Sequence, residues 1–411
     1  MKQILFFSFF LGIGILLREY LAGFAYKQLV FDMYEYHAHA LGILRGEYAI
    51  DCCLKNMGYP VVLAGIYALF GIGNLEAAKQ INILLDIGVA LLLYSVGKNA
   101  FNKRVGTLAF ILYIINPFTS SFTGLILAES TTLFFSAILI YILASPQFKK
   151  KPIFWILFGF LLGITVFLKH SYYRFSLGIL VVFFLFLFQW KKRMLFLFIS
   201  LAGFLIASVY SLIGNYQNFG RVTVVPPYGM QTGILYGMFY LERYPEISQD
   251  PQPHAEFTKM ALDFAYEGIP KTEFNKKYSS LFWEKMKTDW PIYVKHVGTN
   301  VFHLWDKDHL YVYEDPFRPY DLWPLRISNV ILLTCFLIGI GKYLWQKKGF
   351  AFHEPLALFT ISLFAYMLLL YPIVSSESRH TIPFYPFLIL WAAYGILECQ
   401  KYLLGKSYYD R

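Results

Sequence analysis

The chain has 411 residues, a net charge of +10 at neutral pH, and a composition that is 57% hydrophobic and only 15% charged. Its mean hydropathy is +0.49. Soluble domains carry about a quarter charged residues, so the composition excludes a soluble globular protein and indicates an integral membrane protein. The positive charge does not indicate nucleic-acid binding, because most Lys and Arg residues lie in short clusters between apolar runs.

Ten apolar segments are long enough to cross a bilayer, allowing for tilt. They are residues 3–24, 75–97, 105–123, 128–144, 153–168, 175–190, 194–213, 327–345, 355–374 and 381–398. The first lacks a small-residue cleavage site, so we expect a retained span rather than a signal peptide. Two shorter apolar stretches, 32–46 and 59–72, are predicted to be interfacial helices, the second beginning near Pro60 and ending at Gly71 and Gly73. The expected fold class is an all-α polytopic membrane protein.

Basic residues predict the orientation of these spans. With the N-terminus inside, 16 Lys and Arg residues lie at cytoplasmic ends and six on short outer segments. The six are Lys27, Arg45, Lys55, Lys169, Arg174 and Arg379. The positive-inside rule therefore predicts a plasma or inner membrane protein with both termini in the cytoplasm.

This topology predicts three parts. Residues 1–213 form a seven-helix transmembrane module that includes a first outer loop, 25–74. Residues 214–325 form one large exoplasmic loop, which ends in an amphipathic stretch from Glu273 to Trp305. Residues 326–411 form a three-helix module with a short cytoplasmic tail.

The first outer loop carries an acidic and aromatic segment that suits chemistry at the membrane surface. Asp32, Glu35, Tyr36 and His39 fall on one face of the predicted helix 32–46, at three- and four-residue spacing. A carboxylate there can act as a general base on a substrate held in lipid. Asp32 followed by Glu35 is also typical of a capping box, so a purely structural role stays open.

The sequence shows no convincing metal site. His37 and His39 are two residues apart, which is not the spacing of a helical metal pair, and the cysteines at 52, 53, 335 and 399 lack metal-ligand spacing. We therefore predict no metal ligands, while a requirement for a divalent ion stays open.

Ionisable residues near the outer ends of the spans form a second group of candidates. Glu129 lies at the turn before the predicted span 128–144, where a charge is costly and marks a functional site or a polar partner within the bundle. Basic residues on the same side suit a phosphate group. They are Arg18, Lys169, Arg174 and Arg379, with His380 beside the last. Each one alone is also typical of a snorkelling anchor, and Glu19 could neutralise Arg18.

Asp86 lies near the middle of the second span, where a carboxylate must be paired or protonated. Arg18 is one partner that the sequence suggests. We interpret Asp86 as structural.

In their order along the chain, these motifs resemble the polyprenyl-phosphate-dependent glycosyltransferases of the GT-C superfamily. The motifs are Arg18 at the end of a first span, Asp32-x-Tyr34, Gly58-Tyr59-Pro60, Ala128-Glu129-Ser130, and Glu377-Ser378-Arg379-His380 with Pro383. The resemblance is closest to the branch that contains protein O-mannosyltransferases and lipid A aminoarabinose transferases. The chain departs from the family in having Met33 after Asp32, Tyr59-Pro60 in place of Pro-Pro, and Lys169-His170 in place of Arg-Pro.

The resemblance implies an activity as well as a fold. The donor would be a monosaccharide on a polyprenyl monophosphate in the outer leaflet, and the acceptor a hydroxyl of a glycan, lipid or protein. Asp32 would be the general base with Glu129 as its partner, the basic residues would hold the phosphate, and one displacement would invert the anomeric centre.

Two other classes of function are compatible with part of the sequence. A transporter or flippase of a lipid-linked glycan would explain the spans, but it predicts inverted repeats and Gly/Pro-broken spans in matching halves, which the sequence lacks. A non-catalytic assembly protein would require the acidic residues to be dispensable.

Overall fold

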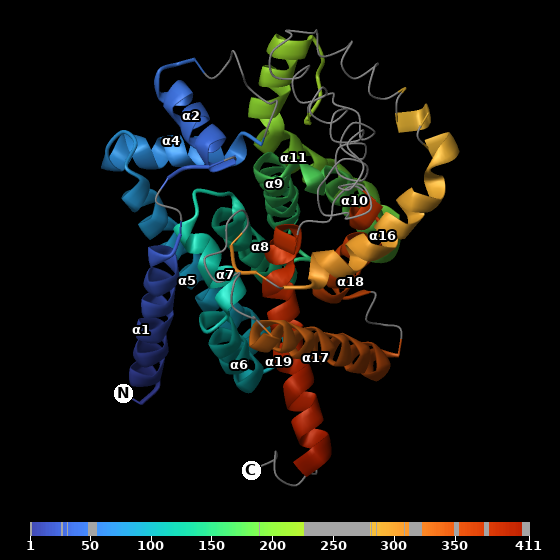
Figure 1. The fold of residues 1–411 in the computed structure, drawn as a ribbon. Coiled ribbons are helices and arrows are strands. Elements are labelled where there is room, and N and C mark those ends of the chain that lie inside the picture. The colour runs from blue at the N-terminus through green and yellow to red at the C-terminus, as the bar shows by residue number, and fades with distance from the viewer. Residues whose placement is uncertain are drawn as a thin grey trace. The chain divides into compact units, whose positions relative to one another are not determined.

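The computed structural model describes residues 2–25, 28–30, 32–47, 56–188, 190–225, 280, 282–284, 286–307, 309–311, 323–348, 353–373 and 378–404. In these ranges the chain forms helices and turns and no strand (Figure 1), which confirms the all-α fold class. Several predicted features lie outside the described residues, namely Lys27, Cys52, Cys53, Lys55, Glu377 and most of the loop 214–325.

The chain divides into two compact units. Unit 1 holds Met1–Pro226, Lys307–Leu363 and Ile382–Arg411, and unit 2 holds Pro227–Asp306 and Phe364–Thr381. Unit 2 thus combines most of the predicted exoplasmic loop with a short segment from near the C-terminus. The three-part division by membrane crossings stays a prediction.

The first part of unit 1 begins with one long helix, followed by two short ones and another long one. These are α1 (Lys2–Gly23), α2 (Asp32–Leu44), α4 (Gly58–Phe70) and α5 (Leu75–Ala100). The short helices α2 and α4 match the two segments predicted as interfacial, and Gly71 with a φ of 108° ends α4. In Figure 1, α2 and α4 pack together at the upper end of the view, whereas α1 begins and α19 ends at its lower end.

A broken helix follows α5. It consists of α6 (Lys103–Ile114), α7 (Pro117–Ser121) and the 3₁₀ turn η1 (Phe122–Gly124), with a bend of 47° between α6 and the rest. The sequence predicted one span over 105–123. The break has a local cause, because Pro117 lacks the N–H that would continue α6, and the Asn116 side chain accepts from Thr119 N–H to start α7.

Three helices complete this half of unit 1 after α8 (Glu129–Leu143). They are α9 (Pro152–Leu168), α10 (Tyr173–Phe186), preceded by the turn η2 (His170–Tyr172), and α11 (Trp190–Phe219). Phe158 of α9, Phe183 of α10 and Phe196 of α11 pack in one buried aromatic cluster, with the first two rings stacked at 5.1 Å. This packing joins the three helices around an apolar core.

The C-terminal part of unit 1 contains α17 (Trp323–Lys347), most of α18 (Pro355–Leu369) and α19 (Tyr385–Leu404). Gly339 and Gly395 let α17 and α19 touch backbone to backbone, since a Cβ on Gly339 would lie 2.1 Å from the Trp391 carbonyl oxygen. Small residues at such crossings are typical of helix pairs in membranes.

The described elements of unit 2 include α16 (Trp290–Trp305), the end of α18, the turn η4 (Tyr371–Ile373) and the start of η5 (Ser378–Phe384). Asn300 Nδ2 donates to the Pro372 carbonyl at 2.8 Å, and Tyr293 Oη donates to the Ile373 carbonyl at 3.2 Å. These bonds attach α16 to η4.

Six helices of the described chain are long and apolar enough to cross a membrane, or seven if the broken helix counts as one span. Helices α8, α9 and α10 coincide with predicted spans but have 15, 17 and 14 residues. At about 1.5 Å per residue they are shorter than a hydrocarbon core of about 30 Å. The chain is therefore a multi-pass membrane protein by composition and helix length, and the count of ten spans stays a prediction.

Candidate functional site

The candidate acidic segment lies on α2, which begins at Asp32 and has Glu35 in its first turn. Tyr36 is buried and meets Tyr59 of α4 edge to face, with 5.6 Å between ring centroids. Asp32 and His39 are partly buried. Of the face of α2 predicted to carry chemistry, Tyr36 thus packs on α4.

A second contact joins the same two helices. His37 Nδ1 and Tyr67 Oη share a hydrogen bond of 2.7 Å. Burial lowers the pKa of His37 and raises the pKa of Tyr67 to about 12, so both side chains are neutral at physiological pH. The pair therefore fixes α2 on α4 without adding charge to the site.

Glu129 and Lys169 form a buried ion pair, with Lys169 Nζ donating to Glu129 Oε1 at 2.7 Å. Their side chains are 3% and 8% exposed. Glu129 is the first residue of α8, and Lys169 directly follows the last residue of α9. Two residues that the sequence assigned to different roles, catalysis and phosphate binding, are in direct contact.

Tyr59 connects this ion pair to α2. Burial raises the pKa of the Tyr59 hydroxyl, and the neighbouring Tyr67, Glu129 and Tyr36 raise it further. Asn82 of α5 donates to the Leu125 carbonyl at 3.0 Å and, more weakly, to Tyr59 Oη at 3.4 Å. Asp32 therefore lies on the helix that contacts Tyr59, and Glu129 lies close enough to Tyr59 to act on it electrostatically.

The chain just before α4 holds the Lys169 turn in place. Asn56 Oδ1 accepts from the backbone N–H of His170 at 2.8 Å. A Cβ on Gly58 would lie 2.7 Å from backbone atoms of both Phe167 and Leu168, so only glycine permits this approach. Burial lowers the pKa of His170 to about 4, which leaves its ring neutral at physiological pH.

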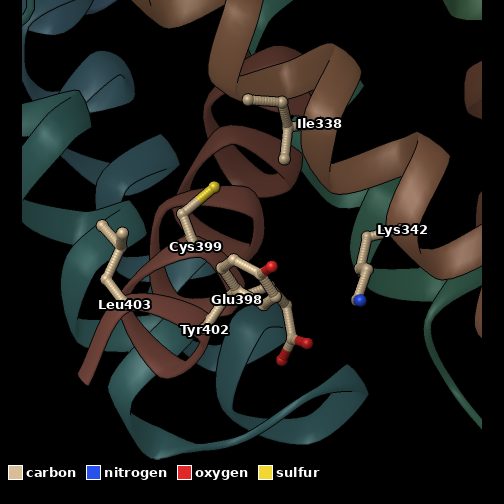
Figure 2. Close-up of a pocket in the computed structure, with 6 residues that line it drawn as sticks. All are labelled: Ile338, Lys342, Glu398, Cys399, Tyr402 and Leu403. Atoms are coloured by element: carbon tan, nitrogen blue, oxygen red, sulfur yellow. The ribbon is translucent and has the colours of Figure 1, made fainter. Parts of the chain in front are cut away.

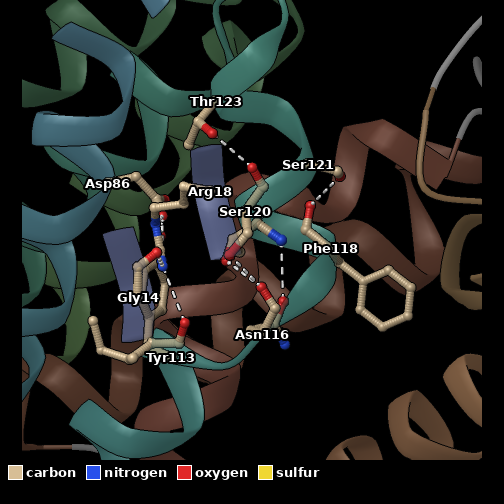
Figure 3. Close-up of polar contacts among 11 residues, drawn as sticks. Gly14, Arg18, Asp86, Tyr113, Asn116, Phe118, Ser120, Ser121 and Thr123 are labelled. Carbon is tan, nitrogen blue, oxygen red and sulfur yellow. Dashed lines mark hydrogen bonds and ion pairs between the residues drawn. The ribbon is translucent and has the colours of Figure 1, made fainter. Parts of the chain in front are cut away.

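Arg18 lies in a buried network of polar contacts (Figure 3). Arg18 Nε donates to Asp86 Oδ2 at 2.7 Å, and its Nη1 donates to the carbonyls of Gly14 and Ile114. Tyr113 Oη donates to the other Asp86 oxygen, and Arg18 and Asp86 are both fully buried. The suggested pairing of Arg18 with Asp86 is confirmed, whereas Glu19, the other partner considered, accepts from Gln80 at 3.0 Å.

This network of polar contacts stabilises the break between α6 and α7. Ile114 is the last residue of α6, and its carbonyl points at the break before Pro117. A guanidinium that satisfies this carbonyl while pairing with a buried carboxylate stabilises irregular backbone inside an apolar bundle. These contacts favour a structural role for Arg18, and its predicted phosphate contact stays a prediction.

The remaining basic candidates are described separately in the two units. Arg174 is exposed in the first turn of α10 in unit 1. Arg379 and His380 lie in η5, in unit 2, where the His380 ring packs on Tyr371 with 5.2 Å between centroids.

A shallow pocket in unit 1 contains none of the candidate residues. It lies near the C-terminal ends of α17 and α19, and its lining includes Lys342, Glu398 and Tyr402 (Figure 2). Within the described ranges, no group of three or more His, Cys, Asp or Glu side chains could hold a metal ion.

Sequence reasoning missed several residues that build the site. Asn82 lies one turn before Asp86 in an apolar helix, and this four-residue spacing of polar side chains was a usable signal. The sequence indicates Tyr59 only as part of the motif Gly58-Tyr59-Pro60, with no role of its own. Asn56 gave no signal, because its partner is a backbone group 114 residues away.

Comparisons with known proteins agree with this architecture. The family model described as dolichyl-phosphate-mannose-protein mannosyltransferase matches residues 55–212, which is less than half of the chain. A crystal structure of the Archaeoglobus fulgidus oligosaccharyltransferase, tethered to an acceptor peptide, aligns with a TM-score of 0.54 over 94% of this chain at 12% identity. The chain has the GT-C fold.

A second structure with the GT-C fold aligns almost as well. It is oligosaccharyltransferase AglB from Archaeoglobus fulgidus in complex with an inhibitory peptide and a dolichol-phosphate, with a TM-score of 0.53, 98% coverage of this chain and 12% identity. The present chain spans about half the length of these two proteins, 49% and 52% respectively. No curated protein matches the sequence.

The family match covers the ion pair but not the acidic helix. Residues 55–212 include Tyr59, Glu129 and Lys169, whereas Asp32 and Arg379 lie outside. Within this GT-C fold, the support for Asp32 is therefore its position on α2 and the contact of α2 with Tyr59.

Proposed function

We propose that this protein is a membrane glycosyltransferase that moves a monosaccharide from a polyprenyl-phosphate donor to an acceptor hydroxyl at the outer membrane face. The observation that carries the proposal is the buried Glu129–Lys169 pair, held beside α2 and α4 by Tyr59, Asn56 and Gly58. The GT-C fold and the mannosyltransferase family match support the reaction class.

In the proposed reaction, Lys169 meets the donor phosphate. An ammonium group has three N–H donors, and Glu129 accepts from Lys169 through one of them. A phosphate oxygen can accept from another, so the cation offsets the charge that grows on the leaving phosphate as the glycosyl bond breaks. Arg174, Arg379 and His380 remain candidates for the same task because of their charge.

Asp32 is the proposed general base. Its carboxylate takes the proton of the acceptor hydroxyl while the hydroxyl oxygen forms a bond to the anomeric carbon and the polyprenyl phosphate leaves. A single displacement inverts the anomeric centre and needs no covalent enzyme intermediate. Glu129 lies across Tyr59 from α2 and is proposed to orient the acceptor or Lys169. The acceptor class, whether glycan, lipid or protein, follows from none of these contacts.

The experiment is sugar transfer from a radiolabelled polyprenyl-phosphate sugar in membranes that contain the wild-type protein or its Asp32→Asn variant. Asn keeps the size of Asp and is a comparable N-cap, so a capping role predicts near-normal transfer. A general base predicts normal expression with transfer reduced by about 10²–10⁴-fold. Glu76→Gln is a matched control, because Glu76 is an exposed carboxylate in the first turn of α5.

Two results would contradict the proposal. A folded Asp32→Asn variant with wild-type transfer would remove this residue from the chemistry. Wild-type membranes that translocate the labelled lipid without transferring its sugar would instead favour a flippase. Analysis of the anomeric configuration of the product tests the inverting step separately.

A further inference from the structure

Helix α16 in unit 2 presents three different faces. One face is buried and carries His296, Asn300 and Leu304, at intervals of four residues. On this face, Asn300 donates to the Pro372 carbonyl of η4. Within the described residues, this face attaches α16 to η4.

A second face of α16 is apolar and exposed. Trp290, Val294 and Phe302 are 55%, 56% and 63% exposed, and the partly exposed Val301 lies between them on the helix surface. Trp283, in the preceding helical residues, is also 55% exposed. An exposed apolar stripe of this size marks a surface that contacts a partner or a membrane.

The third face of α16 is polar and borders the apolar one. Lys295, Thr299 and His303 are exposed and recur every four residues. A helix with an apolar stripe, a neighbouring cationic and polar stripe, and Trp near its start has the pattern of a helix that lies in the membrane interface. At about 24 Å, its 16 residues are too short to span the bilayer core of about 30 Å.

The attachment of α16 sets its depth. The turn η4 is the end of the candidate span Pro355–Ile373, so it lies where a membrane crossing finishes. Leu369 and Leu370, just before η4, are 69% and 55% exposed, as expected of side chains that face lipid. Because Tyr293 and Asn300 bond to η4, α16 is attached at the depth where this crossing finishes.

We infer that α16 is an interfacial helix, and that the occupant of its apolar face is the boundary between lipid headgroups and acyl chains. Trp290, Val294 and Phe302 enter the boundary, while Lys295 and His303 stay at the level of the headgroup phosphates. The helix holds the end of the large loop on the membrane surface. This inference concerns a surface outside the proposed catalytic site and does not depend on the glycosyltransferase activity.

The test uses the full-length protein in nanodiscs of phosphatidylcholine and phosphatidylglycerol, in a background without native cysteines. Single cysteines at 294 and 302 carry a nitroxide spin label, and one at 299 on the polar face is the matched control. Collision rates are measured with oxygen, which concentrates in lipid, and with a water-soluble nickel chelate. Labels at 294 and 302 should show at least about a threefold higher oxygen-to-nickel ratio than the label at 299.

Two outcomes would overturn the inference. Equally low oxygen-to-nickel ratios at 294, 299 and 302 would mean that both the apolar and the polar face are in water. Labels at 294 and 302 that reach neither reagent would mean that protein covers the apolar face. All three positions are exposed. A second measurement uses the Val294→Ser/Phe302→Ser variant, whose total Trp emission should be quenched less by brominated lipids than that of wild type.

Discussion

Gly58 of α4 and Leu168 of α9 touch backbone to backbone, at a point two residues from Asn56 and one residue from Lys169. The contact brings the helix that packs on α2 against the turn that supplies the buried cation. Any displacement of α4 here would move Lys169 relative to Glu129. The position of the ion pair thus depends on a residue with no functional group.

Replacing Gly58 by Ala should therefore reduce both stability and transfer. The new Cβ would lie 2.7 Å from three backbone atoms, which must shift to accept it. Forced insertions into a packed interior cost about 1–3 kcal/mol. Gly65→Ala on the same helix is the control, since a Cβ there meets nothing within 4 Å. Thermal unfolding in detergent and the transfer assay provide the readouts, and equal behaviour of the two variants would refute this account.

The stability of the protein should decrease as the pH decreases, because His170 is buried in its neutral form. Burial lowers the folded pKa of this residue from 6.5 to about 4, so between these values the unfolded chain binds a proton that the folded chain does not. The stabilisation is present above pH 6.5 and is lost as the pH falls toward 4. His170→Asn, which keeps the backbone bond to Asn56, should flatten the decline of the Tm across this window.

The control for His170 is the same change at the exposed His303, which should leave the pH profile as in wild type. An unchanged profile in His170→Asn would assign the acid sensitivity to other groups.

Local signals explain what the sequence could predict. The bounds of α2 and α4 follow from apolar runs ended by glycines, and the expected 32–46 and 59–72 are close to the observed Asp32–Leu44 and Gly58–Phe70. The residues Asn116–Pro117 indicated a helix break, but the length of the apolar run 105–123 predicted one continuous span. A hydropathy profile averages over a window of residues. It therefore does not detect the helix break caused by the missing backbone N–H of Pro117.

Pairing of the charged residues could not be predicted in the same way. Lys169 and Glu129 are 40 residues apart, and their contact depends on the rotation of two helices about their axes. Apolar spans constrain that rotation weakly, because lipid and protein interior are both apolar. Arg18 shows the consequence, since its charge and depth fitted a phosphate ligand equally well until Asp86 and Ile114 were placed beside it.

Variants of Arg18 test whether its charge stabilises the fold or binds the donor. Arg18→Met alone leaves the buried carboxylate of Asp86 without its cation, and removing one partner of a buried pair costs about 3–5 kcal/mol. Combining it with Asp86→Asn removes the charge and keeps a group that can accept from Tyr113. The double variant should recover most of the lost Tm and transfer the sugar with a KM for donor near that of wild type. A double variant that is stable but has a KM raised more than about tenfold would restore Arg18 to the donor site.

The Glu129–Lys169 pair should follow the same pattern in stability but the opposite one in activity. Lys169→Met and Glu129→Leu should each lower stability by about 3–5 kcal/mol, because each leaves one buried charge unpaired. The double variant should regain stability, since an apolar pair can replace a buried ion pair without loss. Its transfer activity should stay at least about 100-fold below wild type, because the proposed phosphate contact and the acidic partner are both gone.

The exposed pair Arg45–Glu47, 3.0 Å apart just after α2, is the control for this cycle. Neutralising it should change stability by no more than about 1 kcal/mol and leave transfer intact, since surface pairs are screened by water. The informative comparison is between stability and activity in the Lys169→Met/Glu129→Leu protein. If that protein is both stable and active, the pair is a packing device, and the donor phosphate must be held by other cations. If it is stable and inactive, the charges are required for the reaction itself.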